Sequence, residues 1–267
     1  MNIEDISKSY FDFEITNKLF QRKIKDQNYW DFVRYPVFME VFNIYKGKRK
    51  SYIFNKKQKN STFKISFLSI LSIFHLFKGI LKIFTSKNKY DIIFYSTGGR
   101  KKIENNYVNS YCFYHLKSLS SSYKILVIET AKFNDRSFEK IDCDYVYIPL
   151  KSARLLSLLK PKGKANIEIE KLKIKFIDQL NMNINIKPII KNNYYTQITL
   201  NKIINKILNY TKPKIMGFVN DGNSKFFIKA AKDMNIPIFE LQHGDVSKFD
   251  MVSSYPDKID GDTWIQD

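Results

Sequence analysis

The chain has 267 residues, of which 44% are hydrophobic and 15% aromatic. This composition is enough for one large α/β domain or two small ones, and it excludes wholesale disorder. The formal net charge of +19 raises nucleic acid or an anionic membrane as partner, but only six of the 45 basic residues are arginines. Because arginine is the side chain that reads base edges and binds phosphates in a bidentate way, we expect no specific nucleic-acid binding.

The cysteines and the first residues indicate the compartment. Cys112 and Cys143 are too few for a disulfide framework and have no metal-ligand spacing, so we expect reduced thiols packed as small hydrophobes. The opening residues 1–10 include Glu4 and Asp5 and no apolar core, which is not typical of a signal peptide. The sequence therefore predicts a cytoplasmic protein.

Residues 1–88 are predicted to form a helical, basic N-terminal region. Helices are expected over residues 19–30 and 30–42, with a break at Pro36. A connector over residues 46–59 follows, in which seven of fourteen positions are basic. The most apolar segment of the chain, residues 63–84, comes next and is predicted to be a helix.

The apolar helix over residues 63–84 has two interpretations. Its basic side chains gather on one edge at 100° per residue, namely Lys64, His75, Lys78 and Lys82. The helix either packs against its domain with this edge in solvent, or lies in the interface of an anionic leaflet, helped by the lysine-rich connector. Neither interpretation makes it a membrane span, because the uncharged run 65–77 is shorter than the roughly 20 residues needed.

From residue 89 onward, short apolar runs alternate with amphipathic segments. Strands are expected over five runs, Tyr90–Ser96, Lys124–Glu129, Tyr145–Leu150, Lys214–Val219 and Ile236–Leu241. Helices are expected over four segments, Asn109–Leu119, Lys162–Asn181 (facing solvent), Tyr194–Tyr210 and Asn223–Asn235. This alternation predicts an α/β fold, with a parallel sheet and crossover helices.

Three of the predicted strands are followed by residues that could bind a ligand. Ligands of open parallel sheets collect beyond the carboxyl ends of the strands, so we expect all three segments to open onto one edge. In the first segment, Gly98 and Gly99 allow close backbone approach, and Arg100 suits a phosphate or a carboxylate. A simple strand-to-helix turn explains the same residues.

The second segment contains Asp221, directly after the strand that ends at Val219. Asp221 is a candidate base or hydroxyl-binding carboxylate, although either it or Asn223 could instead cap the next helix. The third segment contains His243. An unperturbed histidine has a pKa of about 6.5, which suits it to move protons or to hold a phosphate when charged. A structural role for His243 is about as frequent at such a position.

A resemblance to a known family lies in the run from Lys212 to Pro256. It carries, in order, Ala230-Ala231-Lys232, Ile236-Pro237, Glu240-Leu241-Gln242-His243-Gly244 and Tyr255-Pro256. This order resembles a segment of bacterial capsule and surface-polysaccharide glycosyltransferases. The runs YDIIFYSTGGRKK (90–102) and KILVIET (124–130) resemble the first two strands of that family, and WDFVRYPVF (30–38) resembles its N-terminal segment more loosely.

The resemblance implies a GT-B enzyme, in which two Rossmann-like domains face a cleft without an essential metal or other cofactor. Residues 89–256 would be the acceptor-side domain, a Rossmann-like sheet with helices on both faces. His243 would then act as base or as donor to the sugar or phosphate, together with Asp221 as a second candidate base. The substrate-binding residues implied are Gly98, Gly99, Arg100, Glu240, Gln242, Gly244 and Tyr255.

The expected activity is transfer of a sugar from a nucleotide-sugar to a capsule or lipopolysaccharide glycan, on a lipid-linked acceptor at the inner face of the cytoplasmic membrane. Residues 257–267 form a tail where the family has a second domain, so we expect a truncated enzyme or one completed by another chain. The alternative is a non-catalytic Rossmann-like remnant or binding module at the membrane surface. A lysine-rich nucleic-acid-binding protein is the third hypothesis and ranks last.

Overall fold

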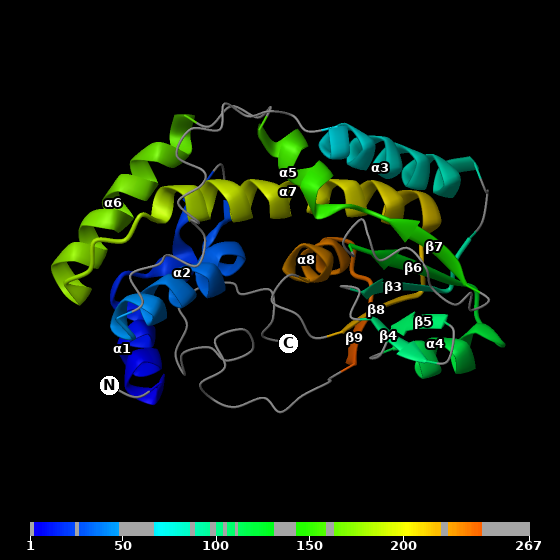
Figure 1. Ribbon diagram of the computed structural model, residues 1–267, viewed down its shortest axis with the longest axis horizontal. Helices are drawn as coiled ribbons and strands as arrows, with labels where there is room; N and C mark the ends of the chain where they lie inside the picture. Colours follow the sequence, from blue (N-terminus) through cyan, green and yellow to red (C-terminus); the bar gives the residue numbers. More distant parts are fainter. Residues whose placement is uncertain are drawn as a thin grey trace. The chain divides into compact units, whose positions relative to one another are not determined.

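A computed structural model describes residues 3–24, 27–47, 67–85, 89–96, 100–103, 106–109, 112–130, 143–158, 163–219 and 224–241 (Figure 1). These residues group into two compact units. The first unit contains α1 (Ile3–Thr16), the 3-10 turn η1 (Leu19–Gln21), β1 (Lys23–Ile24), β2 (Gln27–Asn28), α2 (Trp30–Tyr45), α6 (Gly163–Leu180) and α7 (Ile186–Thr211) as far as Gln197. The second contains α7 from Ile198 onward and all the other elements.

The first unit is built around a buried ion pair between α1 and α2. The Arg34 guanidinium donates to both carboxylate oxygens of Glu14, at 2.6 and 3.0 Å, and Trp30 Nε1 donates to the same carboxylate at 2.7 Å. Both charged side chains are fully buried. Burial raises the pKa of the Glu14 carboxyl, and the nearby Arg34 charge and these hydrogen bonds oppose that shift. Three donors supply the partners that a buried carboxylate requires.

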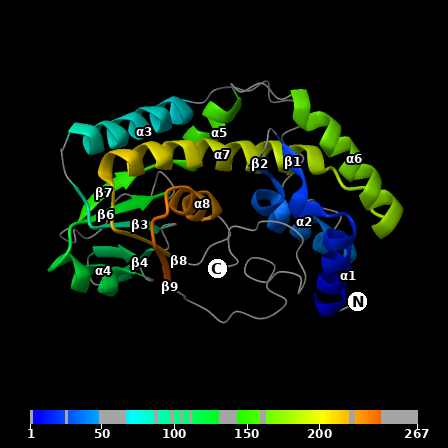
Figure 2. The ribbon, with the colours of Figure 1, turned by 180° about the vertical axis from the view of Figure 1, so that it is seen from behind.

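An aromatic contact and a hydrogen bond attach α6 and α7 to the rest of the first unit. Figure 2 shows these helices from behind. The Phe13 ring of α1 lies 4.4 Å from the Phe176 ring of α6, between centroids. The Tyr194 hydroxyl of α7 donates to the backbone carbonyl of Ile24 at 2.8 Å. The prediction that α6 faces solvent is therefore wrong for one side of the helix: a stripe at i, i+3 and i+7 is buried, formed by Ile169, Leu172 and Phe176.

The helix predicted over residues 19–30 is wrong. Lys18 adopts a left-handed conformation with φ of 48°, which ends the preceding helical path, and the 3-10 turn and the β1–β2 hairpin follow. The break expected at Pro36 is also wrong, because Pro36 lies inside α2. The helix continues past it, since buried Val33 and Val37 hold both sides of the proline in the core.

The second unit contains a five-stranded parallel sheet in the order β7-β6-β3-β8-β9. Its strands are β3 (Ile92–Ser96), β6 (Ile125–Glu129), β7 (Asp144–Tyr147), β8 (Ile215–Val219) and β9 (Ile238–Leu241). All five predicted strands and their parallel arrangement are confirmed. Numbered along the chain, the order is 3-2-1-4-5, which is compatible with a Rossmann-like, doubly wound fold.

Helices cover both faces of this sheet, as predicted (Figure 1). On one face, Cys112 and Leu116 of the α4 segment (helix Phe113–Ser120) pack against Phe94, Val127 and their neighbours. On the other face, the centroid of the Tyr95 ring lies 5.1 Å from that of Phe226 and 5.3 Å from that of Phe227, both in α8 (Lys225–Asp233). The amide of Asn201 in α7 donates to a backbone carbonyl of α8 at 3.1 Å, so α7 belongs to this second layer.

The apolar segment after the connector is a helix, α3 (Phe67–Thr85), within the described residues. It covers β7: Leu76 and Ile83 are buried, and a Cβ at Gly79 would lie 3.0 Å from a Val146 methyl group. Lys82 pairs with Asp144 at 3.4 Å. Among the described helices, none is long and apolar enough to cross a membrane.

Two further elements depart from the predictions. Residues expected to begin a helix at Asn109 form instead the second strand of a hairpin, β4 (Arg100–Ile103) with β5 (Asn106–Asn109), and α4 begins only at Phe113. Asn109 pairs with Arg100 of β4, so this cross-strand pairing, which the local helical spacing does not reveal, makes residues 106–109 a strand. The remaining helix of the second unit is α5 (Leu150–Leu158).

We predict that Gly217→Ala destabilises the second unit by about 1–3 kcal/mol through overpacking. A Cβ at this position would meet the Phe239 ring and would lie 2.7 Å from the Phe94 ring, so both rings must move. The measurement is urea unfolding followed by circular dichroism. Gly79→Ala is the matched control, because it meets one methyl group and a carbonyl and gains helix propensity. Equal stability of the two variants would contradict the packing argument.

For the first unit, we predict that Arg34→Met or Glu14→Leu alone costs about 3–5 kcal/mol, because each leaves one buried charge without its partner. The double variant Glu14→Leu/Arg34→Met should be more stable than either single variant. Lys8→Met, which removes only an exposed pair with Glu4 at 3.4 Å, is the control and should change stability by less than about 0.5 kcal/mol. Additive losses in a double-mutant cycle of thermal unfolding would show that the two charges do not depend on each other.

Candidate functional site

Three adjacent strands end side by side at one edge of the sheet. In the order β3, β8, β9, they end at Ser96, Val219 and Leu241, and Val219 is the register partner of Leu241. Because all three run parallel, the segments that follow them leave from the same edge, as predicted from the sequence. The chain order reverses between β3 and β8, and ligands of doubly wound sheets bind outside the carboxyl ends at such a reversal.

Most of the candidate residues named from the sequence lie outside the described residues, so their roles remain predictions. They are Gly98, Gly99, Asp221, Gln242, His243, Gly244 and Tyr255. Arg100 is described in its backbone alone, as the first residue of β4, where it pairs with Asn109. Glu240 is described in full: it lies on β9 beside Phe218 of β8, and its side chain is exposed.

The structure adds buried polar side chains at the same edge, which the sequence analysis did not single out. They are Ser96 and Glu129 at the ends of β3 and β6, Thr130 directly after β6, and Ser224 and Lys225 at the start of α8. Ser96 and Glu129 are register partners. The Tyr95 hydroxyl and the Thr130 hydroxyl share a hydrogen bond of 3.1 Å. Buried polar side chains therefore lie at the edge where the chain order reverses.

Cys112 lies close to two of these side chains, Ser96 and Glu129. Burial raises the pKa of its thiol to about 12, the negative charge of Glu129 adds to that shift, and a hydrogen bond with Ser96 opposes it. The three side chains are thus neighbours on the α4 face of the sheet. A thiol with so high a pKa stays protonated at neutral pH, which makes Cys112 a packing residue and no nucleophile.

Glu129 and Lys225 place a buried carboxylate and a buried ammonium group at this edge, and both interact with other groups of the protein. A carboxylate that ends the second strand of a doubly wound sheet is positioned to accept hydrogen bonds from sugar hydroxyls. A lysine in the first turn of the helix after β8 adds positive charge where backbone N–H groups already favour anions. Neither residue stands out in the sequence, because Glu129 simply ends an apolar strand and Lys225 lies near the start of an amphipathic helix.

At the opposite edge of the sheet, an acidic side chain links the starts of several strands. Asp91, before β3, pairs with Lys214 at 2.8 Å and accepts the backbone N–H of Lys124 at 3.1 Å. The hydrogen bond with Lys214 lowers the pKa of the Asp91 carboxyl, and the hydrogen bond from the Lys124 N–H adds to that shift. These contacts join the starts of β3, β6 and β8, so Asp91 has a structural role. No group of three or more His, Cys, Asp or Glu that could hold a metal ion occurs within the described part of the chain.

Comparisons of the chain with family models, with curated proteins and with solved structures give no match.

Proposed function

We propose that this chain is the acceptor-side half of a glycosyltransferase that extends a capsule or lipopolysaccharide glycan. The observation that carries the proposal is the strand order of the second unit. It brings the ends of β3, β8 and β9 together at the chain reversal, where the family-like segments containing Arg100, Asp221 and His243 begin. The polar side chains at the same edge, Ser96, Thr130 and Ser224, support a polar ligand such as a sugar phosphate.

The proposed reaction forms one bond and breaks one bond. An acceptor hydroxyl loses its proton to His243 or Asp221, and its oxygen bonds to the anomeric carbon of the donor sugar. The bond between that carbon and the phosphate oxygen breaks, and a nucleoside diphosphate leaves. Positive groups stabilise the leaving phosphate, with Arg100 and Lys225 as candidates in this half. In a GT-B enzyme, the second domain would hold the nucleotide, and no resident metal or cofactor is part of the proposal.

The second candidate function is a binding module at an anionic membrane surface, and one observation favours it. On α3, three large apolar side chains spaced i, i+3 and i+7 are exposed, Phe74 (62%), Phe77 (60%) and Leu81 (63%). Lys78 lies beside this stripe, on the side away from the buried Leu76, and Lys82 follows one turn later, where it pairs with Asp144 of β7. An exposed apolar stripe with a lysine beside it is typical of helices that lie in a lipid interface. The same contact would bring the enzyme to a lipid-linked acceptor at the cytoplasmic face.

We predict that His243→Ala lowers sugar transfer about 100-fold or more, since a general base contributes a factor of that size. The assay measures incorporation of labelled sugar from a mixture of nucleotide-sugars into glycan, in bacterial membranes that hold the acceptor and the partner domain. His115→Ala is the matched control, because His115 is exposed on α4 and should leave transfer unchanged. Full activity of His243→Ala would remove His243 from the mechanism. No transfer by the unaltered chain, together with intact vesicle binding, would favour the binding module.

We predict that Phe74→Gln/Phe77→Gln/Leu81→Gln lowers co-sedimentation with anionic phospholipid vesicles about tenfold or more, because the apolar area that enters the interface is lost. Tyr114→Gln, which alters an exposed aromatic residue on α4, is the control. The altered positions are exposed, so circular dichroism should show an unchanged fold. Vesicle binding that survives the triple variant would show that α3 does not contact lipid.

A further inference from the structure

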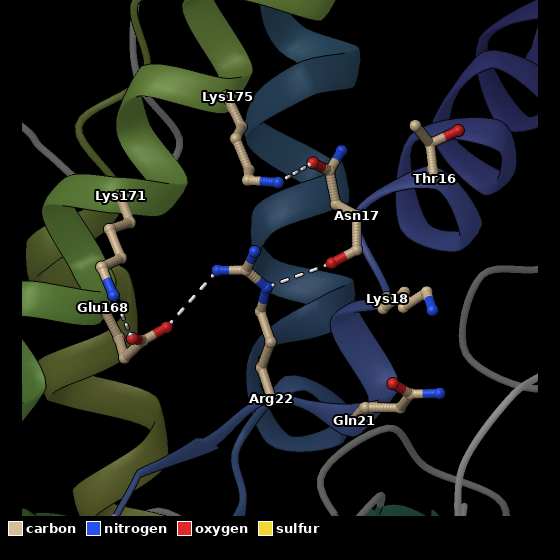
Figure 3. Close-up of a pocket in the computed structure, with 8 residues that line it drawn as sticks. All are labelled: Thr16, Asn17, Lys18, Gln21, Arg22, Glu168, Lys171 and Lys175. Atoms are coloured by element: carbon tan, nitrogen blue, oxygen red, sulfur yellow. Dashed lines mark hydrogen bonds and ion pairs between the residues drawn. The ribbon is translucent and has the colours of Figure 1, made fainter.

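The first unit contains an open, polar pocket of about 450 Å³ between the end of α1, the turn that follows it, and α6 (Figure 3). Among the described residues, those that line it are all polar or charged. Four of these described residues are cations, Lys18, Arg22, Lys171 and Lys175, and one is an anion, Glu168. The lining therefore carries an excess of positive charge in a concave place.

Neutral oxygens of one buried residue hold two of the four cations in place. Arg22 Nε donates to the backbone carbonyl of Asn17 at 3.1 Å, and Lys175 Nζ donates to the side-chain oxygen of Asn17 at 2.6 Å. The Asn17 amide nitrogen in turn donates to Phe13 and Gln179, which fixes the orientation of the amide. These hydrogen bonds position the two cations without neutralising their charges.

The Glu168 carboxylate of the pocket is shared between two cations. Glu168 lies 3.4 Å from Arg22 Nη1 and 3.4 Å from Lys171 Nζ, so both contacts are long for charged groups. Figure 3 shows the Arg22 guanidinium between Glu168 and Asn17, with Lys171 and Lys175 extending from α6 toward the same space. The Arg22 side chain is 21% exposed, so it is partly desolvated and can still be reached by a ligand.

We propose that this pocket binds a phosphate-bearing anion, with a pyrophosphate group as the best match. Several cations held at fixed positions by neutral partners suit a ligand with more than one negative charge. The volume falls in the range of small-molecule sites, which exceeds what one inorganic phosphate needs. The described part of the lining contributes charged and polar groups and no aromatic ring, so these residues recognise the anionic part of the ligand.

The pyrophosphate could come from a soluble compound or from the headgroup of a lipid-linked precursor, and both present the same chemistry. The site lies in the first unit and uses none of the residues assigned to sugar transfer. It therefore stands or fails independently of the proposed function.

The test measures binding of sodium pyrophosphate to the full chain by titration calorimetry. Lys18→Asn/Lys171→Gln should weaken binding about tenfold per cation, because each removes one charge-assisted contact. These substitutions leave the Asn17 hydrogen bonds intact, and asparagine accepts the left-handed backbone of residue 18, whose φ is 48°. Lys8→Gln is the matched control, because it removes one positive charge from α1 outside the pocket.

A second variant gives an effect of opposite sign. Glu168→Gln removes a negative charge from the lining, so it should tighten pyrophosphate binding about threefold or more, although two ion pairs of the protein are lost. If no variant binds pyrophosphate, the cluster is purely structural and the proposal is overturned. Weaker binding by Glu168→Gln, or equal binding by the chain with and without Lys18→Asn/Lys171→Gln, would overturn the proposal.

Vesicles distinguish the two sources of the anion. Co-sedimentation is measured with phosphatidylcholine vesicles that contain a lipid diphosphate, in the Phe74→Gln/Phe77→Gln/Leu81→Gln background, so that α3 does not contribute. Binding that Lys18→Asn/Lys171→Gln abolishes identifies a lipid-linked diphosphate as a ligand. Binding of soluble pyrophosphate alone identifies a soluble phosphate compound, and binding of neither contradicts the site.

Discussion

The row Phe94, Gly217 and Phe239 constrains the centre of the sheet. These residues are register partners across β3, β8 and β9, and the two rings meet over the glycine with their centroids 6.1 Å apart. Only a residue without a side chain leaves room for both rings on this face, so the row holds β8 between its neighbours in one register. A slip by a single residue would turn the aromatic rings to the opposite face. The common edge at which the three strands end depends on this register.

The two edges of the sheet use polar groups in different ways. At the amino edge, half-buried Asp91 pairs with Lys214, accepts the N–H of Lys124 and joins three strand starts. At the carboxyl edge, the polar side chains of Ser96, Glu129 and Lys225 are buried near the chain reversal. Burial of charge alone does not mark a site, because the Glu14–Arg34 pair of the first unit is buried and structural. The carboxyl edge is the proposed functional edge because the chain order reverses there.

The sequence was sufficient for the sheet and insufficient for the first unit, for a physical reason. Each strand of the sheet is a short apolar run with a turn on both sides, and such runs are recognisable locally. The first unit joins residues near the N-terminus to α6, more than 100 positions later, through contacts such as Phe13 with Phe176. The charged composition of α6 concealed its buried stripe. Likewise, a local motif in the sequence predicts a role for His243, whereas Glu129 becomes a candidate only through the strand order.

Two arginines of the first unit show how its charges divide between structure and binding. Arg34 is fully buried and contacts both oxygens of Glu14, at 2.6 and 3.0 Å, so its charge is matched within the core. Arg22 is partly exposed, and it contacts a neutral carbonyl at 3.1 Å and a carboxylate at 3.4 Å that it shares with a lysine. A core arginine is saturated by its own protein. Arg22 keeps much of its charge available, in a pocket with three further cations, and an anion completes that arrangement.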